Sequence, residues 1–188
     1  MSVFHIANKE ITYNTDECNQ LIKALRWELL KLEINEQQCR YIVFSKRQYE
    51  QFLAWRYCNS ELDGLVSHFN NIEIVVVPSE APLAFLSHED LYLNKLEKLP
   101  NKFEKEIYAW FEKNKDELKG KQLEPCYWVV SKTGYQHLVN LMWEHFQDVG
   151  NIRSCKINKI FNCKLVISPD QRLNLLVPNL EDSYLRLD

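Results

Sequence analysis

The feature that most constrains the fold of this chain is an internal repeat. Residues 41–49 (YIVFSKRQY) and 127–135 (YWVVSKTGY) are identical at five of nine positions, at an offset of 86 residues. Further on, 69–70 matches 161–162 at an offset of 92, and the run 74–78 resembles 165–169. The second copy is therefore expected to carry about six extra residues, within 151–160. Matches in the same order along the chain predict that its two halves share one fold.

The first copy is predicted to run helix, strand, helix, strand, strand. Helical spacing of apolar residues and short β-branched or aromatic runs predict the following elements: a helix over 16–33, a strand over 41–44, a helix in two pieces broken near Asn59 and reaching Phe69, and strands over 72–77 and 83–86, the last as a hairpin partner. Thr15 is the expected cap of the first helix, and Ser45 with Gln48 has the spacing of a capping box. Ser87 is expected to cap a charged helix over 88–98.

The second copy predicts the same order: a helix over 102–119, a strand over 127–130, a helix capped by Ser131, and strands over 162–168 and 173–177. The sequence Leu99-Pro100-Asn101 is the best point of division, giving domains 1–99 and 100–188. A strand–helix–strand unit forms a right-handed crossover with parallel strands, so each half should hold a mixed sheet of about three strands.

The expected fold class is therefore α/β to α+β, with two tandem α-β-α-β-β repeats. Three strands and one helical layer are marginally stable alone. The halves are therefore expected to pack together as an internal pseudo-dimer with approximate two-fold symmetry.

Composition excludes several function classes. Only 4 of 188 residues are glycine, too few for a Walker loop or a dinucleotide fingerprint. The net charge of −3 argues against a nucleic-acid binder. No apolar run approaches the ~18 residues of a membrane span, and the first residues lack the pattern of a secretory signal. We therefore expect a cytoplasmic protein without a cofactor.

Neither a metal centre nor a catalytic group emerges from the reactive side chains. The six cysteines form no C-x-x-C pair, and the five histidines form no pair at metal-binding spacing. Cys126 and His137 could pair as nucleophile and base, but no cysteine stands at a predicted helix start inside a glycine-containing elbow. We therefore assign no catalytic residue and expect six reduced thiols.

The repeated Ser-Lys helix start is one candidate binding site. Ser45 and Ser131 each precede a helix whose first N–H groups and dipole favour an anion, and Lys46 and Lys132 add positive charge beside them. A small anionic ligand such as a nucleotide would suit these positions. The alternative is that each serine only caps its helix while each lysine is exposed, which explains the repetition equally well.

A second candidate surface lies at Trp55, Arg56 and Tyr57. These positions fall partly outside the apolar stripe of their helix, and Trp, Arg and Tyr are the residues enriched at interface hot spots. The remaining tryptophans are expected in the core. Stacking on nucleic-acid bases is disfavoured by the acidic charge balance.

The layout resembles small proteins of bacteriophages and prophages, in its strand, its Ser-x-x-x-Tyr helix start, its apolar strand ending in proline and its short final strand. This resemblance implies no residue roles. The leading hypothesis is a non-enzymatic protein that binds or assembles with a protein partner. The alternative is a binder of a small anion at the Ser-Lys helix starts, and a weaker one is an enzyme whose residues converge only in the folded chain.

Overall fold

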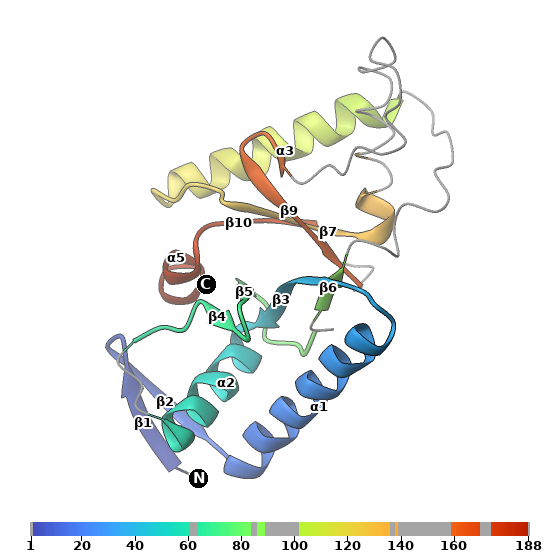
Figure 1. Cartoon of the computed structure of the whole chain (residues 1–188). Coiled ribbons are helices and arrows are strands. Elements are labelled where there is room, and N and C mark those ends of the chain that lie inside the picture. Colours follow the sequence, from blue (N-terminus) through green and yellow to red (C-terminus); the bar gives the residue numbers. More distant parts are fainter. Residues whose placement is uncertain are drawn as a thin grey trace. The chain divides into compact units, whose positions relative to one another are not determined.

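The structure of this protein is a computed structural model that describes residues 2–60, 64–83, 86–88, 102–135, 138, 159–169 and 174–187 (Figure 1). Its fold is α+β, with helices beside three separate sheets. The chain divides into two compact units, Met1–His88 together with Leu180–Asp188, and Glu89–Asn179. Within the described ranges, no helix is both long enough and apolar enough to pass through a bilayer.

The first unit begins with a β-hairpin that the sequence analysis did not anticipate. Strands β1 (Ser2–Ile6) and β2 (Lys9–Tyr13) pair in antiparallel fashion across a two-residue turn. Ala7 and Asn8 form the turn, both with positive φ (47° and 63°), as expected of the primed turns that match strand twist. Phe4, Ile6 and Ile11 are buried, so the hairpin covers part of the core.

A four-stranded mixed sheet forms the centre of this unit, in the order β4-β5-β3-β6. Strands β3 (Cys39–Ser45) and β5 (Ile72–Val77) are parallel, as the crossover argument predicted. The short strands β4 (His68–Phe69) and β6 (Leu86–His88) flank them in antiparallel orientation. Residues 42–44 and 74–77 are at most 1% exposed, which explains their continuous apolar sequence.

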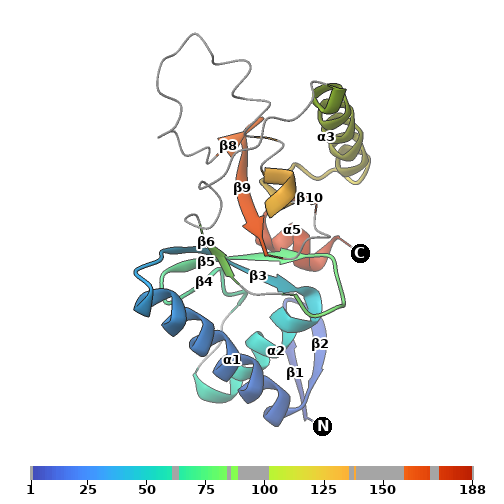
Figure 2. The same ribbon diagram turned by 90° about the vertical axis from the view of Figure 1, so that its right-hand side faces the viewer.

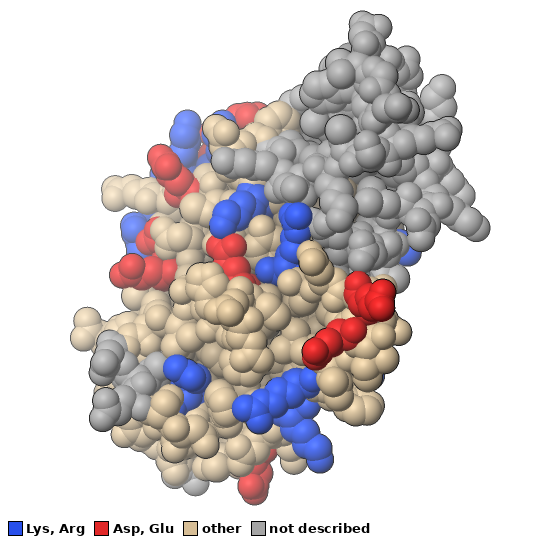
Figure 3. All heavy atoms as spheres, viewed as in Figure 1, with Lys and Arg blue, Asp and Glu red and all other residues tan. Residues whose placement is uncertain are grey.

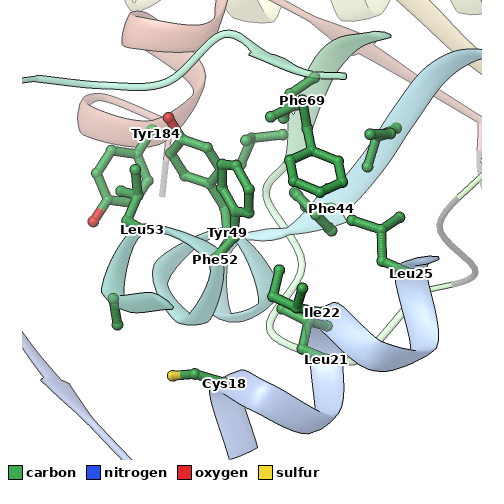
Figure 4. Packing of buried hydrophobic residues seen from close by; sticks show 14 of the residues in the cluster. Cys18, Leu21, Ile22, Leu25, Phe44, Tyr49, Phe52, Leu53, Phe69 and Tyr184 are labelled. Carbon is green, nitrogen blue, oxygen red and sulfur yellow. The ribbon is translucent and has the colours of Figure 1, made fainter. Parts of the chain in front are cut away.

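Helices α1 (Thr15–Ile34) and α2 (Lys46–Asn59) lie on the same side of this sheet in two perpendicular views (Figures 1 and 2). One face of α1 points into the core through Cys18, Leu21, Ile22 and Leu25, toward the aromatic side chains of α2 and β3 (Figure 4). The short C-terminal helix α5 (Leu180–Leu185) packs on β5. Its Tyr184 ring is fully buried and lies 5.2 Å from the Tyr49 ring.

The second unit holds a four-stranded sheet in the order β10-β7-β9-β8. Its elements are helix α3 (Lys102–Gly120) and strands β7 (Tyr127–Ser131), β8 (Lys159–Ile160), β9 (Cys163–Ser168) and β10 (Asn174–Val177). The Trp128 ring, 1% exposed, stacks on the Trp110 ring, and its Nε1 donates to Asn174 Oδ1 at 2.8 Å. Strands β7 and β9 are parallel, and β10 and β8 flank them in antiparallel orientation.

Several predictions about the first half were wrong in detail. The first helix is capped by Asn14, whose Oδ1 accepts from the Asp16 amide at 2.9 Å, and not by Thr15. Helix α2 ends at Asn59, and in the described part of the expected second helical piece residues 64–67 are not helical and His68–Phe69 form β4. Here Asn70 and Asn71 adopt positive φ and close a β4–β5 hairpin, which outweighs the helical spacing of the apolar residues.

The last strand of each half also pairs differently from the expectation. Strand β6 spans 86–88, so Ser87 lies in a strand instead of capping a helix. Of the helix expected over 88–98, the first residue lies in β6 and residues 89–98 fall outside the described ones. β6 and β10 pair with β3 and β7, not with the strands that directly precede them. The reason is that β4 and β8 already occupy the outer edges of β5 and β9, which also raises each sheet from three strands to four.

The division of the chain at 99 and 100 stays a prediction, because 89–101 lies outside the described residues. The sequence assigned residues 180–188 to the second half, whereas Leu180–Asp188 groups with the first unit. The six-residue insertion expected within 151–160 likewise involves residues outside the described part. In the β4–β5 and β8–β9 hairpins, however, Asn71 and Asn162 occupy the same turn position. At this point the two copies of the repeat are therefore offset by 91 residues and not by the 92 expected from the sequence.

Candidate functional site

The start of helix α2 is occupied by the protein's own groups. Ser45 is fully buried, and its Oγ accepts from the Gln48 amide at 3.2 Å. Gln48 Oε1 accepts from the Ser45 amide at 3.0 Å, which completes the predicted capping box. The Lys46 amide donates to the Ser79 carbonyl at 2.9 Å. Three amides that would hold an anion at this helix start therefore already donate to oxygen atoms within the chain.

Lys46 has a negative neighbour one turn further along α2. Burial raises the pKa of the Glu50 carboxyl, and the charge of Glu80 adds to the rise. The Tyr184 hydroxyl and the charges of Lys9 and Lys46 offset only part of it. Tyr184 donates to Glu50 Oε1 at 3.3 Å, and Lys9 Nζ donates to the Tyr184 carbonyl at 2.9 Å. The carboxylate of Glu50 accounts for a lysine near the positive end of the helix dipole.

The second Ser-Lys start has a similar cap. Ser131 is 7% exposed, and its Oγ accepts from the Gly134 amide at 3.1 Å. Lys132 to Tyr135 continue as a helical turn. The capping role assigned to both serines is thus present, and an anion site at either helix start stays a prediction.

Trp55, Arg56 and Tyr57 do not form one surface, because consecutive helical residues point about 100° apart. Trp55 is half-buried and packs on the Phe52 and Phe69 rings, with the Arg26 guanidinium 5.4 Å from its ring centre. Tyr57 is 50% exposed and stacks on Phe4 at 4.8 Å. Arg56 is also half-buried, and its Nε has no hydrogen-bond partner in the described part of the chain.

Helix α1 carries an exposed apolar stripe that the sequence analysis missed. Trp27 is 57% exposed, Leu30 43% and Ile34 70%. Their spacing places them on one side of the helix, away from the buried face of Leu21, Leu25 and Leu32. Trp27 was expected in the core, and that expectation is wrong. The available signal was a second helical stripe at 27, 30 and 34, outside the stripe that explained the core.

A shallow groove lies beside this stripe, between α1 and α2. Its volume is about 370 Å³, and it is lined by Asn19, Ile22, Lys23, Arg26, Trp27, Leu30 and Trp55. The sequence prediction thus found one of its members, Trp55. Two tryptophans with an arginine match the composition of interface hot spots, and the charged residues among them are all basic.

Charge is unevenly distributed along α1. On the face shown in Figure 3, Lys and Arg side chains lie over the middle of the helix, and Asp and Glu side chains lie near its C-terminal end, while the first turn holds Asp16 and Glu17 and the last turn holds Lys31. Lys23 and Glu33 are both exposed. Within the described residues, neither forms an ion pair. Both charges are therefore available to a binding partner.

The reactive side chains are not gathered into a catalytic or metal site in the described ranges. No three His, Cys, Asp or Glu residues there lie close enough to hold a metal ion. None of the five described cysteines is in a disulfide. Burial raises the pKa of both Cys18 and Cys39 to about 11, so these thiols are poor nucleophiles. Of the pair considered for catalysis, Cys126 is half-buried and His137 lies outside the described residues.

The chain was compared with family models, curated proteins and solved structures, and nothing matches in any of the three. The resemblance to phage and prophage proteins therefore stays a prediction.

Proposed function

We propose that this chain is a non-enzymatic protein that acts by binding or assembling with another protein, and that it is built from a duplicated α/β module. The α1 stripe of Trp27, Leu30 and Ile34, together with the adjoining groove, is the binding surface.

The duplication is supported by two sheets of equivalent order. Each has a central parallel pair, a strand of two residues on the outer side of the later parallel strand, and a final antiparallel strand on the other edge. Tyr41 pairs with Glu73 in one sheet and Tyr127 with Lys164 in the other. Both short hairpins turn through two residues with positive φ, and the serine that ends β3 or β7 caps the helix that follows.

The observation that carries the binding function is the exposure of Trp27, Leu30 and Ile34 along one side of α1. Large apolar side chains that share one helix face, beside a groove holding Trp55 and Arg26, are typical of helix-mediated recognition. The alternative anion-binding function loses support, because the Ser45 cap and the Ser79 carbonyl occupy the amides it requires.

The test is a partner identified from cells of the source organism and then purified on its own. Its affinity for the chain is measured by calorimetry with the wild type, with Trp27→Ala and with Tyr57→Ala. Trp27→Ala should weaken binding about tenfold or more, as expected of a central aromatic anchor. Tyr57→Ala removes an aromatic side chain of similar exposure from the surface that the sequence analysis offered, and it should leave the affinity unchanged if α1 is the binding surface.

An identified partner whose affinity is insensitive to Trp27→Ala would refute the assignment of this surface. If neither a purified protein partner nor a second copy of the chain bound it, the proposed binding function itself would be wrong.

A further inference from the structure

The apolar stripe of α1 has charges of opposite sign toward its two ends. Lys23 lies one turn before Trp27, on the stripe itself. Glu33 precedes Ile34, the most exposed large apolar side chain described, and points about 100° away from it, toward the groove side of the helix. Arg26, on the groove side of the helix, adds positive charge to the Lys23 end. A stripe with this pattern is complementary to a reversed copy of itself.

The spacing of the residues supports such a pairing. When two α1 helices meet antiparallel about a two-fold axis midway between Trp27 and Leu30, Trp27 of one copy is level with Leu30 of the other. The partner's Ile34 is then level with Lys23, which lines the groove together with Asn19, Arg26 and Trp27. A single apolar side chain entering a hole between residues of the facing helix is the packing found in helix pairs.

The charges match in the same arrangement. The partner's Glu33 lies one residue from the level of Lys23, a displacement of about 1.5 Å along the axis. Because the pairing is symmetric, the contact occurs twice. A parallel arrangement would instead place Lys23 against the partner's Lys23 and Glu33 against the partner's Glu33, which is unfavourable.

We infer that the occupant of the α1 surface is a second copy of this chain, bound through an antiparallel α1–α1 interface with Ile34 of each copy in the groove of the other. This inference rests on the proposed function and names its partner. Three exposed apolar side chains per copy supply less area than a standard stable interface, so the dimer is weak and dissociates on dilution.

The first measurement is the mass of the full chain by sedimentation equilibrium, from about 1 μM to about 1 mM, a range that covers weak interfaces. The wild type should pass from monomer to dimer within this range. Lys23→Glu alone and Glu33→Lys alone should each weaken dimerisation about tenfold or more, because each variant places like charges together at both contacts.

An equimolar mixture of the two variants tests whether positions 23 and 33 contact each other across the interface. The single variants decide the orientation, because in a parallel pair each would only exchange one like-charge contact for another. In a mixed antiparallel dimer, Lys23 of the Glu33→Lys chain faces Glu33 of the Lys23→Glu chain, and the two substituted side chains face each other with opposite charge. The mixture should therefore recover the wild-type affinity. Lys113→Glu and Glu117→Lys on α3 are the same exchanges at exposed positions elsewhere and should leave dimerisation of the chain unchanged.

A wild type that is monomeric at every concentration overturns the inference, and so does a dimer that neither variant weakens or that the mixture does not restore. The proposed function has a separate outcome. A monomeric chain that binds an identified protein through Trp27 would retain the binding function and lose only the second copy as its partner.

Discussion

Gln48 provides the sharpest stability test, because one side chain joins the start of α2 to a distant loop. Its Oε1 accepts from the Ser45 amide at 3.0 Å and from the Leu83 amide at 3.1 Å, and its Nε2 donates to the Leu83 carbonyl at 3.0 Å. Gln48 is 4% exposed and Leu83 7% exposed. Water therefore cannot readily replace these bonds when the side chain is removed.

Gln48→Ala removes three hydrogen bonds, each with a net value of about 1 kcal/mol, and it leaves two buried N–H groups and one carbonyl without that partner. The expected loss in the free energy of unfolding is about 3–5 kcal/mol. Ser45→Ala removes only one cap bond and should cost about 1 kcal/mol. The tertiary bonds of Gln48 should therefore outweigh the local cap several-fold.

Gln51→Ala is the matched control, because it removes the same atoms from the same helix. Gln51 Nε2 donates only to the exposed Glu17 Oε2, at 3.2 Å, so its loss should cost at most about 0.5 kcal/mol. Urea unfolding followed by tryptophan fluorescence gives the free energies, and native-state hydrogen exchange should show lost protection at the Leu83 amide. The reasoning is refuted if Gln48→Ala costs no more than Gln51→Ala.

Three further predictions follow from local environments. Burial raises the pKa of the Glu50 carboxyl, so the folded wild type loses stability as this group ionises above the ordinary carboxyl range. Glu50→Gln should therefore gain stability relative to the wild type as the pH rises above that range. Urea midpoints measured against pH would follow parallel curves for the two proteins if this is wrong. Cys58, which is exposed, should be alkylated by iodoacetamide before Cys18, whose pKa burial raises to about 11, and peptide mass spectrometry would reveal the reverse order. Millimolar phosphate or nucleotide should leave the melting temperature unchanged, both in the wild type and in a variant with Lys46 and Lys132 replaced by Ala. A ligand that raises the melting temperature of the wild type alone would instead support an anion site at these lysines.

The sequence by itself determined the elements whose causes lie within a few residues. The Ser45–Gln48 box specifies a helix start because both partners lie within one turn. The apolar runs of β3, β5, β7 and β9 specify buried strands, and a strand–helix–strand unit permits one handedness with parallel pairing. The residues around Ser131 also predicted its role as a helix cap. They could not show whether a ligand, instead of the serine oxygen, accepts hydrogen bonds from the amides at the helix start.

Tertiary structure decided everything that depends on which edge or face remains available. β6 pairs with β3 because the Asn70-Asn71 turn has already placed β4 on β5. Helix α5 lies on the first unit because the Tyr184 ring finds its packing partner in Tyr49, 135 residues earlier in the chain. On α1, two helical stripes compete for burial, and the single sheet beneath can cover only one. The core takes the Leu21–Leu25 face and leaves Trp27 in solvent, where it can bind a partner.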